Sequence, residues 1–143
     1  MPARSAKAIW NGKISDGSGT MHMASGAYEG PYSVPSRFED GDGTNPEELI
    51  AAAHAGCFSM AFSGELTRNG TPPTKIETNA TVHINKLEEG WRITKIELNT
   101  EAVVPGINDA DFQAKAKTAK ENCPVSKALG GVNEIVLTAK LIS

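Results

Sequence analysis

The sequence predicts an α+β fold with mainly antiparallel sheets packed on central helices, in the order β-β-β-α-β-β-α-β. Two segments with alternating apolar and polar residues flank a glycine-containing turn, which is typical of a β-hairpin. A long apolar segment opens with residues that favour the start of a helix. A shorter helical segment then leads into a last alternating strand. At 143 residues the chain is long enough for one domain with its own core, and we expect a single domain over residues 1–143.

The N-terminal third is expected to be mostly extended. Residues 5–13 and 20–24 have the composition of two short strands, and the glycine-rich residues 16–19 can form the hairpin turn between them. Residues 32–38 are expected to be extended and strand-like. An acidic, glycine-rich connector at 39–43 then leads into the first helix.

The first helix has clear start and stop signals. Asn45 can cap it, Pro46 suits the first helical position, and Glu48 completes an arrangement like a capping box. The helix is expected to run to about Arg68, where Asn69-Gly70 ends it. Its middle is apolar on nearly all sides, so we expect it to be buried, with a sheet on one side and a second chain on the other.

The second half of the chain alternates strand and helix signals. Asp109 can cap a second helix, and Pro124 should interrupt that helix because it lacks a backbone N–H donor. The expected elements are a hairpin of strands at 78–87 and 91–103, a helix at 110–121, a helical turn at 125–129 and a strand at 134–142.

Composition excludes some classes of function. The net charge is −3, with 14 basic and 17 acidic residues, which argues against a nucleic-acid-binding face. The apolar stretches fall short of the roughly 20 residues that cross a bilayer, and the start of the sequence lacks a secretory-signal pattern. We therefore expect a cytoplasmic protein with no membrane partner, where a transient catalytic disulfide is more plausible than a permanent one.

The two cysteines, Cys57 and Cys123, are the residues on which any catalytic function depends. They could be inert core residues, a structural disulfide, metal ligands or a redox couple. The two cysteines and three histidines show no ligand spacing, so no metal is expected. From its alanine-rich surroundings alone, Cys57 is best interpreted as a packing residue, because free cysteine is often buried. A reactive thiolate at Cys57 would need a cation from elsewhere in the fold.

Arg37 is the leading candidate for that cation, and Glu47 is the matching carboxylate. A guanidinium stays charged and can hold a thiolate and a carboxylate together. The alternatives are a surface arginine and an ordinary acidic residue in the first turn of a helix. Glu47 and Cys57 are ten positions apart, which is about 15 Å along a straight helix. The two could meet only through a bend in the helix or across a dimer with antiparallel helices.

The surroundings of Cys123 are equally open to two interpretations. A helix break at Pro124 would expose the thiol to a facing helix and leave unpaired N–H groups that favour a thiolate. A buried cysteine before a kink is the alternative. His54 lies three residues before Cys57 and could share its helical face, so a Cys–His acyl-transfer nucleophile is conceivable, although packing is the better explanation for His54.

Two motifs of the sequence resemble a known family. Residues 43–61, GTNPEELIAAAHAGCFSMA, and residues 119–129, AKENCPVSKAL, are similar to the OsmC/Ohr family of osmotically inducible and organic-hydroperoxide-resistance proteins. The similarity extends over essentially the whole chain. His54 in the first motif, and the stretch Ser36-Arg37-Phe38-Glu39, are closer to the OsmC branch than to the Ohr branch.

This resemblance implies a thiol-dependent peroxidase without a cofactor. Cys57 would be the peroxidatic thiol and Cys123 the resolving thiol, with Arg37 and Glu47 activating the Cys57 thiolate. The expected cycle passes through a sulfenic acid on Cys57 and a Cys57–Cys123 disulfide, which an external dithiol reduces. The resemblance also implies an intertwined homodimer with active sites at its interface.

The expected substrates are organic hydroperoxides, with hydrogen peroxide reduced less efficiently. An apolar wall would provide that preference, and its candidates are Ile50, Phe58, Met60 and Phe62. A different class of function also fits the residues. A non-enzymatic domain could bind a small apolar ligand in the same crevice, with both cysteines serving as packing residues.

Overall fold

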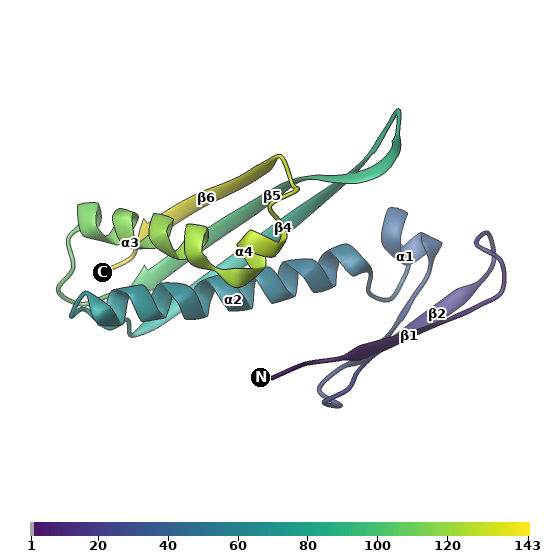
Figure 1. Ribbon diagram of the computed structural model, residues 1–143, viewed down its shortest axis with the longest axis horizontal. Helices are drawn as coiled ribbons and strands as arrows, with labels where there is room; N and C mark the ends of the chain where they lie inside the picture. The colour runs from purple at the N-terminus through teal and green to yellow at the C-terminus, as the bar shows by residue number, and fades with distance from the viewer. Residues whose placement is uncertain (1) are drawn as a thin grey trace. The chain divides into compact units, whose positions relative to one another are not determined.

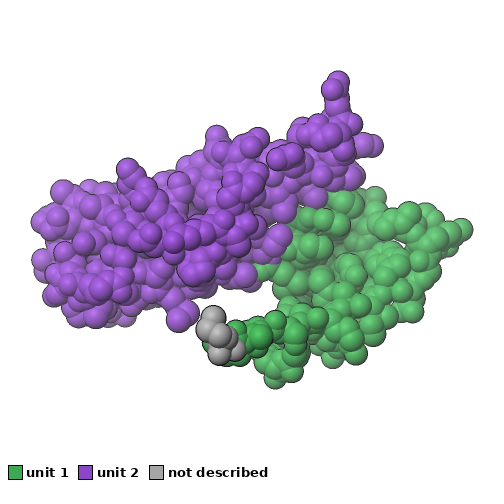
Figure 2. Space-filling view, viewed as in Figure 1, with its two compact units in different colours: residues 1–49 green, residues 50–143 purple. Residues whose placement is uncertain are grey.

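The computed structural model describes residues 2–143, and its strands and helices confirm the predicted α+β class (Figure 1). The chain divides into two compact units, Met1–Leu49 and Ile50–Ser143, which Figure 2 colours separately. Each unit contains one three-stranded sheet.

The sheet of the first unit is an antiparallel meander. Its strands are β1 (Ala6–Asn11), β2 (Ser18–Met23) and β3 (Glu29–Tyr32), which pair in sequence order. The first two strands confirm the predicted hairpin to within two residues at each end. The third strand lies earlier in the sequence than expected.

The prediction of an extended segment at 32–38 was wrong, because a short helix, α1 (Val34–Phe38), occupies most of it. Ser33 and Ser36 determine this helix through a reciprocal capping box. The Ser33 hydroxyl accepts from the Ser36 N–H at 3.2 Å, and the Ser36 hydroxyl accepts from the Ser33 N–H at 2.8 Å. Pro35 in the first turn reinforces the helical start, since its missing N–H would have no helical acceptor there.

Helix α2 (Pro46–Arg68) has the predicted bounds. The Asn45 side chain caps it by accepting from the Glu48 N–H at 2.8 Å. The predicted capping box is not completed, because the Glu48 carboxylate accepts instead from the Thr44 hydroxyl at 2.6 Å. The helix runs without interruption for 23 residues, so the structure does not show the bend that would bring Glu47 to Cys57 within one helix.

The sheet of the second unit contains β4 (Lys75–Leu87), β5 (Gly90–Val103) and β6 (Glu134–Leu141). The antiparallel β4–β5 hairpin confirms the prediction and carries one irregularity, between His83 and Ile84. Strand β6 pairs in parallel with β5, so the sheets are mainly but not wholly antiparallel.

Two helices connect β5 to β6. Helix α3 (Asp109–Asn122) begins one residue earlier than predicted, and its cap is Asn108 rather than Asp109. The Asn108 side chain accepts from the Asp111 N–H at 2.8 Å. Helix α4 (Pro124–Ala128) follows directly, and the break between the two helices falls at Cys123 as the following proline predicted.

The core of the second unit lies between its helices and one face of its sheet. Every fourth residue of α2 points into it, which gives the helix one continuous buried stripe. The buried apolar residues of this core are Phe58, Phe62, Leu66, Leu98, Ala102, Val104, Phe112, Ala116 and Ala119.

The other face of α2 is exposed in the single chain, and it is the face for which the sequence predicted cover by a second chain, which stays a prediction. Ala52, Ala53 and Gly56 are exposed, and Met60 is 79% exposed. The helix thus presents a second, apolar face of small residues.

Helix α2 is also long and apolar enough to cross a membrane by length and composition alone. Its best 18-residue window has a mean hydropathy of 1.2, which corrects the expectation that every apolar stretch falls far short of a bilayer span. A core helix of a water-soluble protein passes the same test. Phe58, Phe62 and Leu66 of α2 lie in the core of the second unit, while only 22% of that window is buried within the chain.

Candidate active site

The two thiols meet inside the second unit. Cys57 lies in the middle of α2, and Cys123 is both the last cap of α3 and the first cap of α4. Their sulfur atoms are 3.0 Å apart, joined by a hydrogen bond, and both cysteines are free. A disulfide bond would bring the two atoms to about 2.05 Å, so the thiols are in contact but not bonded. Cys57 is partly exposed, whereas Cys123 is 0% exposed.

The two thiols differ in acidity. Burial raises the pKa of Cys57, and the neighbouring Cys123 raises it further. Burial also opposes ionisation of Cys123, but hydrogen bonding from Cys57 and from the backbone N–H and hydroxyl of Ser126 outweighs it and lowers the Cys123 pKa. The N–H groups after Pro124 therefore favour a thiolate at Cys123, which agrees with one of the two interpretations that the sequence left open. A hydrogen bond from the Val125 backbone N–H lowers the pKa of Cys57, but burial and the neighbouring Cys123 outweigh it.

A buried histidine lies beside the thiols. His54 is 0% exposed, and its Nε2 lies 2.7 Å from the Ser126 hydroxyl. Its Nδ1 is buried and has no hydrogen-bond partner among the described residues. Burial lowers the pKa of His54, so the ring is neutral at neutral pH. Sequence analysis identified His54 as a packing residue and missed Ser126, whose position three residues after Cys123 was the available signal.

The guanidinium of Arg37 pairs with Glu47 inside the first unit. Arg37 Nε donates to both carboxylate oxygens of Glu47 at 3.1 Å, and Nη2 donates to Oε1 at 2.7 Å. Glu47 is 6% exposed, while the Arg37 side chain is 37% exposed. A buried carboxylate thus holds one edge of a partly open guanidinium in a fixed orientation. The two side chains are thus hydrogen-bonded to each other, and Arg37 lies on α1 and not in the predicted extended segment.

A tight connection between α1 and α2 brings this pair together. The Ser36 hydroxyl donates to the Thr44 carbonyl at 2.8 Å, and the Asn45 side chain donates to the Ser36 carbonyl at 3.0 Å. Gly43 has a φ of +117°, and a Cβ at that position would lie 2.7 Å from the Pro31 carbonyl oxygen. Only glycine allows the connector to turn back closely enough for Arg37 to reach Glu47.

A small pocket of about 120 Å³ opens beside Arg37 in the first unit. The ring of Phe38 lies 5.2 Å from the guanidinium carbon, and the rings of Trp10 and Tyr32 pack at 5.5 Å from each other. The pocket therefore combines a cation with a largely apolar wall. Its lining residues are Trp10, Ile14, Tyr32, Ser33, Val34, Arg37 and Phe38.

The structure contradicts two of the four residues predicted for an apolar wall. Phe58 and Phe62 are 0% exposed in the core, so neither can face a substrate in this chain. Met60 is highly exposed and Ile50 partly so. The pocket residues were missed because the short helix α1, which brings Phe38 next to Arg37, was not predicted.

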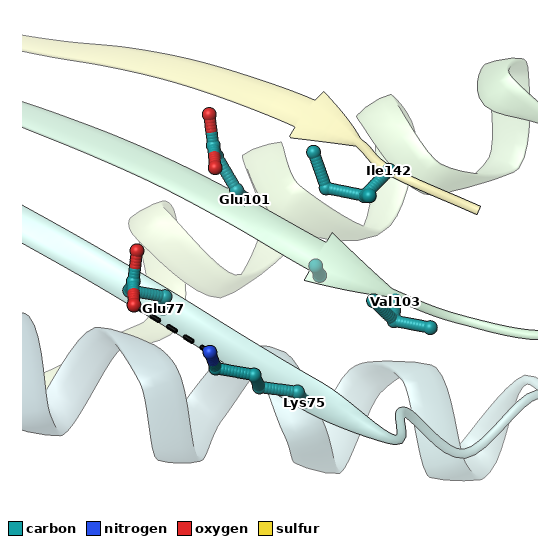
Figure 3. Close-up of a pocket in the computed structure, with 6 residues that line it drawn as sticks. Lys75, Glu77, Glu101, Val103 and Ile142 are labelled. Atoms are coloured by element: carbon teal, nitrogen blue, oxygen red, sulfur yellow. Dashed lines mark ion pairs between the residues drawn. The ribbon is translucent and has the colours of Figure 1, made fainter.

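A second pocket, of about 220 Å³, lies on the outer face of the β4–β5–β6 sheet (Figure 3). Lys75 and Glu77 form an ion pair of 3.6 Å at its edge, and the side chains of both are more than half exposed. The pocket contains neither cysteine, and none of its lining residues lies on a helix. It is separate from the candidate site.

The fold and the thiols together define an α+β protein with a close pair of free cysteines, one partly exposed and one buried. This chain belongs to the OsmC family, since the family model described as "OsmC-like protein" matches residues 39–138. That match includes the two cysteines, His54, Glu47 and Ser126, but begins two residues after Arg37.

Relatives of established name extend the similarity to nearly the whole chain. The protein is 46% identical over 141 residues to the peroxiredoxin OsmC of Escherichia coli, covering 98% of this chain and 97% of that protein. It is 34% identical over 99 residues to an organic hydroperoxide resistance protein of Xanthomonas axonopodis, covering 68% of each chain. An OsmC-like protein of Mycoplasma pneumoniae has the same fold, with a TM-score of 0.78 at 16% identity and 99% coverage of both chains. These comparisons confirm the family and the OsmC-like fold expected from the two motifs.

Proposed function

We propose that this protein is a thiol-dependent peroxidase that reduces organic hydroperoxides, and hydrogen peroxide less efficiently. The observation that carries the proposal is the 3.0 Å contact between two free cysteines of unequal exposure. The names of its relatives, a peroxiredoxin and an organic hydroperoxide resistance protein, point to the same chemistry.

The difference in exposure assigns the two thiols their roles. Cys57 is the one that a peroxide can reach, so its thiolate attacks one peroxide oxygen. The O–O bond breaks, the sulfenic acid forms on Cys57, and the alkoxide that leaves takes a proton to become an alcohol. Cys123 is buried against Cys57 and resolves the sulfenic acid to a disulfide with release of water. An external dithiol then reduces the disulfide to two thiols.

Arg37 and Glu47 complete the proposed site by stabilising the Cys57 thiolate. Burial raises the pKa of Cys57 within its own unit, so this thiol needs a cation that the second unit does not provide. Arg37 is partly exposed, and Glu47 holds its guanidinium in place. Since α2 is continuous from Glu47 to Cys57, we propose that the two pairs meet across an intertwined homodimer. The exposed apolar face of α2 supports a second chain packing there.

The remaining features fit a soluble, cytoplasmic enzyme that functions as one domain over residues 1–143. The apolar pocket beside Arg37 suits the alkyl part of an organic hydroperoxide better than it suits hydrogen peroxide. Cytoplasmic reducing conditions would keep both thiols reduced between turnovers.

One experiment tests this function directly. Purified protein is mixed with one equivalent of cumene hydroperoxide, and the products are identified by mass spectrometry of the intact chain and of its peptides. We expect a Cys57–Cys123 disulfide in the wild type, a stable sulfenic acid or its further oxidation products in Cys123→Ser, and no peroxide consumption in Cys57→Ser. Unchanged peroxide and two free thiols in the wild type would contradict the proposal and favour an apolar ligand-binding domain instead.

A further inference from the structure

The His54–Ser126 contact has no part in the peroxidase cycle described above. The structure joins α2 to α4 at two adjacent points, His54 to Ser126 at 2.7 Å and Cys57 to Cys123 at 3.0 Å. In each helix the two residues are three positions apart, so both contacts lie on the same pair of facing helical surfaces. His54 is 0% exposed and Ser126 is 8% exposed, so solvent does not satisfy either side chain.

Ser126 contacts the histidine and lies in the first turn after the resolving thiol, although Cys123 makes no capping hydrogen bond to that turn in the structure. Cys123 is the N-cap residue of α4, and Ser126 is the third residue after it. At that position of a helix the backbone N–H faces the side chain of the N-cap residue. Both its hydroxyl and its N–H favour the ionised form of Cys123. A serine hydroxyl has a single proton to donate, so it can donate to the Cys123 sulfur only when it accepts from His54.

The chemistry of the histidine ring selects one arrangement of protons. To donate to Ser126, the ring must carry its proton on Nε2, which leaves only a lone pair on the buried and unpartnered Nδ1. The opposite tautomer would bury an N–H without an acceptor, which is the costlier defect. The lowered pKa of His54 keeps the ring neutral, as this tautomer requires.

We propose that His54 and Ser126 are positioning residues for the resolving step. As negative charge develops on the Cys123 sulfur, the Ser126 hydroxyl, which accepts from His54 Nε2–H, donates to that sulfur and completes a hydrogen-bond chain. This donation stabilises Cys123 as it becomes a thiolate opposite Cys57. This inference rests on the proposed peroxidase function. In the step that it assists, the Cys123 thiolate attacks the sulfur of the Cys57 sulfenic acid. The S–S bond forms, the S–O bond breaks, and the departing hydroxide combines with the proton that Cys123 had released, giving water.

A pair of variants of equal shape tests the chain. Ser126→Thr keeps the hydroxyl and Ser126→Val replaces it with a methyl group, so the two differ only in the proposed donor. Rapid-quench mass spectrometry after one equivalent of cumene hydroperoxide separates sulfenic acid formation from disulfide formation. We expect both variants to form the sulfenic acid at the same rate. Disulfide formation should be about threefold to tenfold slower in Ser126→Val. The fraction of Cys123 present as thiolate falls, and the higher nucleophilicity of a thiolate with a higher pKa offsets part of that loss.

The histidine is tested in the same assay. His54→Gln places an amide donor near the position of Nε2, whereas His54→Asn cannot extend far enough to reach Ser126. Disulfide formation should be slowed in His54→Asn and largely restored in His54→Gln. Ser59→Ala is the control, because it removes a hydrogen-bonded hydroxyl of α2 that contacts Thr78 at 2.7 Å and lies in neither of the two contacts between α2 and α4.

A spectroscopic titration distinguishes a role in ionisation from a structural one. The pKa of ¹³C-labelled Cys123 is measured by NMR in a Cys57→Ser background, with and without Ser126→Val, and should rise by about one unit when the hydroxyl is lost. An unchanged Cys123 pKa, or equal disulfide rates in Ser126→Thr and Ser126→Val, overturns the inference and leaves the peroxidase proposal intact. A wild type that consumes peroxide without forming the disulfide overturns the assigned resolving role, and the inference with it.

Discussion

At the scale of single residues, the site depends on a thiol that its own surroundings do not activate. Burial raises the pKa of Cys57, so at neutral pH the isolated second unit holds it as a protonated thiol. Raising the pH through that pKa produces the thiolate, so the rate of peroxide attack should increase with pH until ionisation is complete. A cation near the sulfur moves this increase to lower pH.

Replacing Arg37 should therefore shift the pH profile upward. An opposite charge within about 4–6 Å lowers a pKa by about 1–3 units, so Arg37→Met should move the rise in rate by at least about one pH unit and slow turnover about tenfold near neutrality. The measurement is the initial rate of peroxide consumption across the pH range. Arg68→Met is the control, because Arg68 is an arginine of α2 that pairs with Glu65 at a largely exposed position. An unshifted profile for Arg37→Met would assign Arg37 a structural role.

The candidate residues could be identified from the sequence, but their arrangement could not. Cys57 and Cys123 were identifiable as the two thiols in distinctive motifs. Arg37 and Glu47 were identifiable as charged residues just before and at the start of α2, the helix that contains Cys57. The 3.0 Å contact between the sulfur atoms joins residues 66 positions apart and depends on how α2 packs against the α3–α4 junction. Ser126 was missed for the same reason, since its importance comes from the facing His54.

At the scale of secondary-structure elements, short-range side-chain chemistry decided which predictions were correct. The bounds of α2 followed from Pro46 at its start and Asn69-Gly70 at its end, because these residues act locally on the backbone. Helix α1 was missed because its five residues are too few to show a helical period. Its signal is the reciprocal pair of Ser33 and Ser36, a weaker variant of the usual capping box.

The α1–α2 connection gives a prediction about Gly43. Gly43→Ala combines a positive φ with a close approach to the Pro31 carbonyl, so it should lower the free energy of unfolding by about 1–3 kcal/mol. Peroxidase activity should fall as well, since the change displaces the Arg37–Glu47 pair. Gly70→Ala is a matched control, because Gly70 also has a positive φ, of +85°, but open space around its Cα.

Urea unfolding followed by circular dichroism measures the stability of both glycine variants. Equal losses would mean that the backbone conformation alone matters at Gly43. A larger loss for Gly43→Ala would confirm that close packing of the connector is required there. Activity is measured without urea and at a temperature well below that of unfolding. The effect on the site is then separated from the effect on stability.

At the scale of the whole molecule, the chain has two well-formed sheets and one helix face without cover. The exposed face of α2 consists of Ala52, Ala53, Gly56 and Met60, small or flexible residues that permit close approach of another backbone. Such a surface is unusual on a stable monomer. We expect Met60→Lys to weaken dimerisation, as measured by analytical ultracentrifugation, and to lower activity in proportion to the loss of dimer.

Mixing the inactive Cys57→Ser variant with the impaired Arg37→Met variant tests whether a site is built from two chains. Subunits of Cys57→Ser and Arg37→Met are denatured together and refolded, so that mixed dimers form. When Arg37 serves the Cys57 of the other chain, each mixed dimer contains one intact site, and we expect about a quarter of the wild-type activity from a random mixture. Activity no higher than that of the separate variants would place both residues of a site on one chain.

The contact between the two sulfur atoms affects how long the enzyme stays active when peroxide is abundant. On the proposed mechanism, a Cys57 sulfenic acid either forms the disulfide or meets a second peroxide and becomes a sulfinic acid, which thiols do not reverse. The first fate proceeds at a rate independent of peroxide, and the second accelerates as peroxide accumulates. With the resolving sulfur already 3.0 Å away, no segment has to unfold before the disulfide forms, so the sulfenic acid is short-lived. This arrangement suits an enzyme that must keep working when peroxide is abundant, rather than one that signals its presence by becoming inactivated.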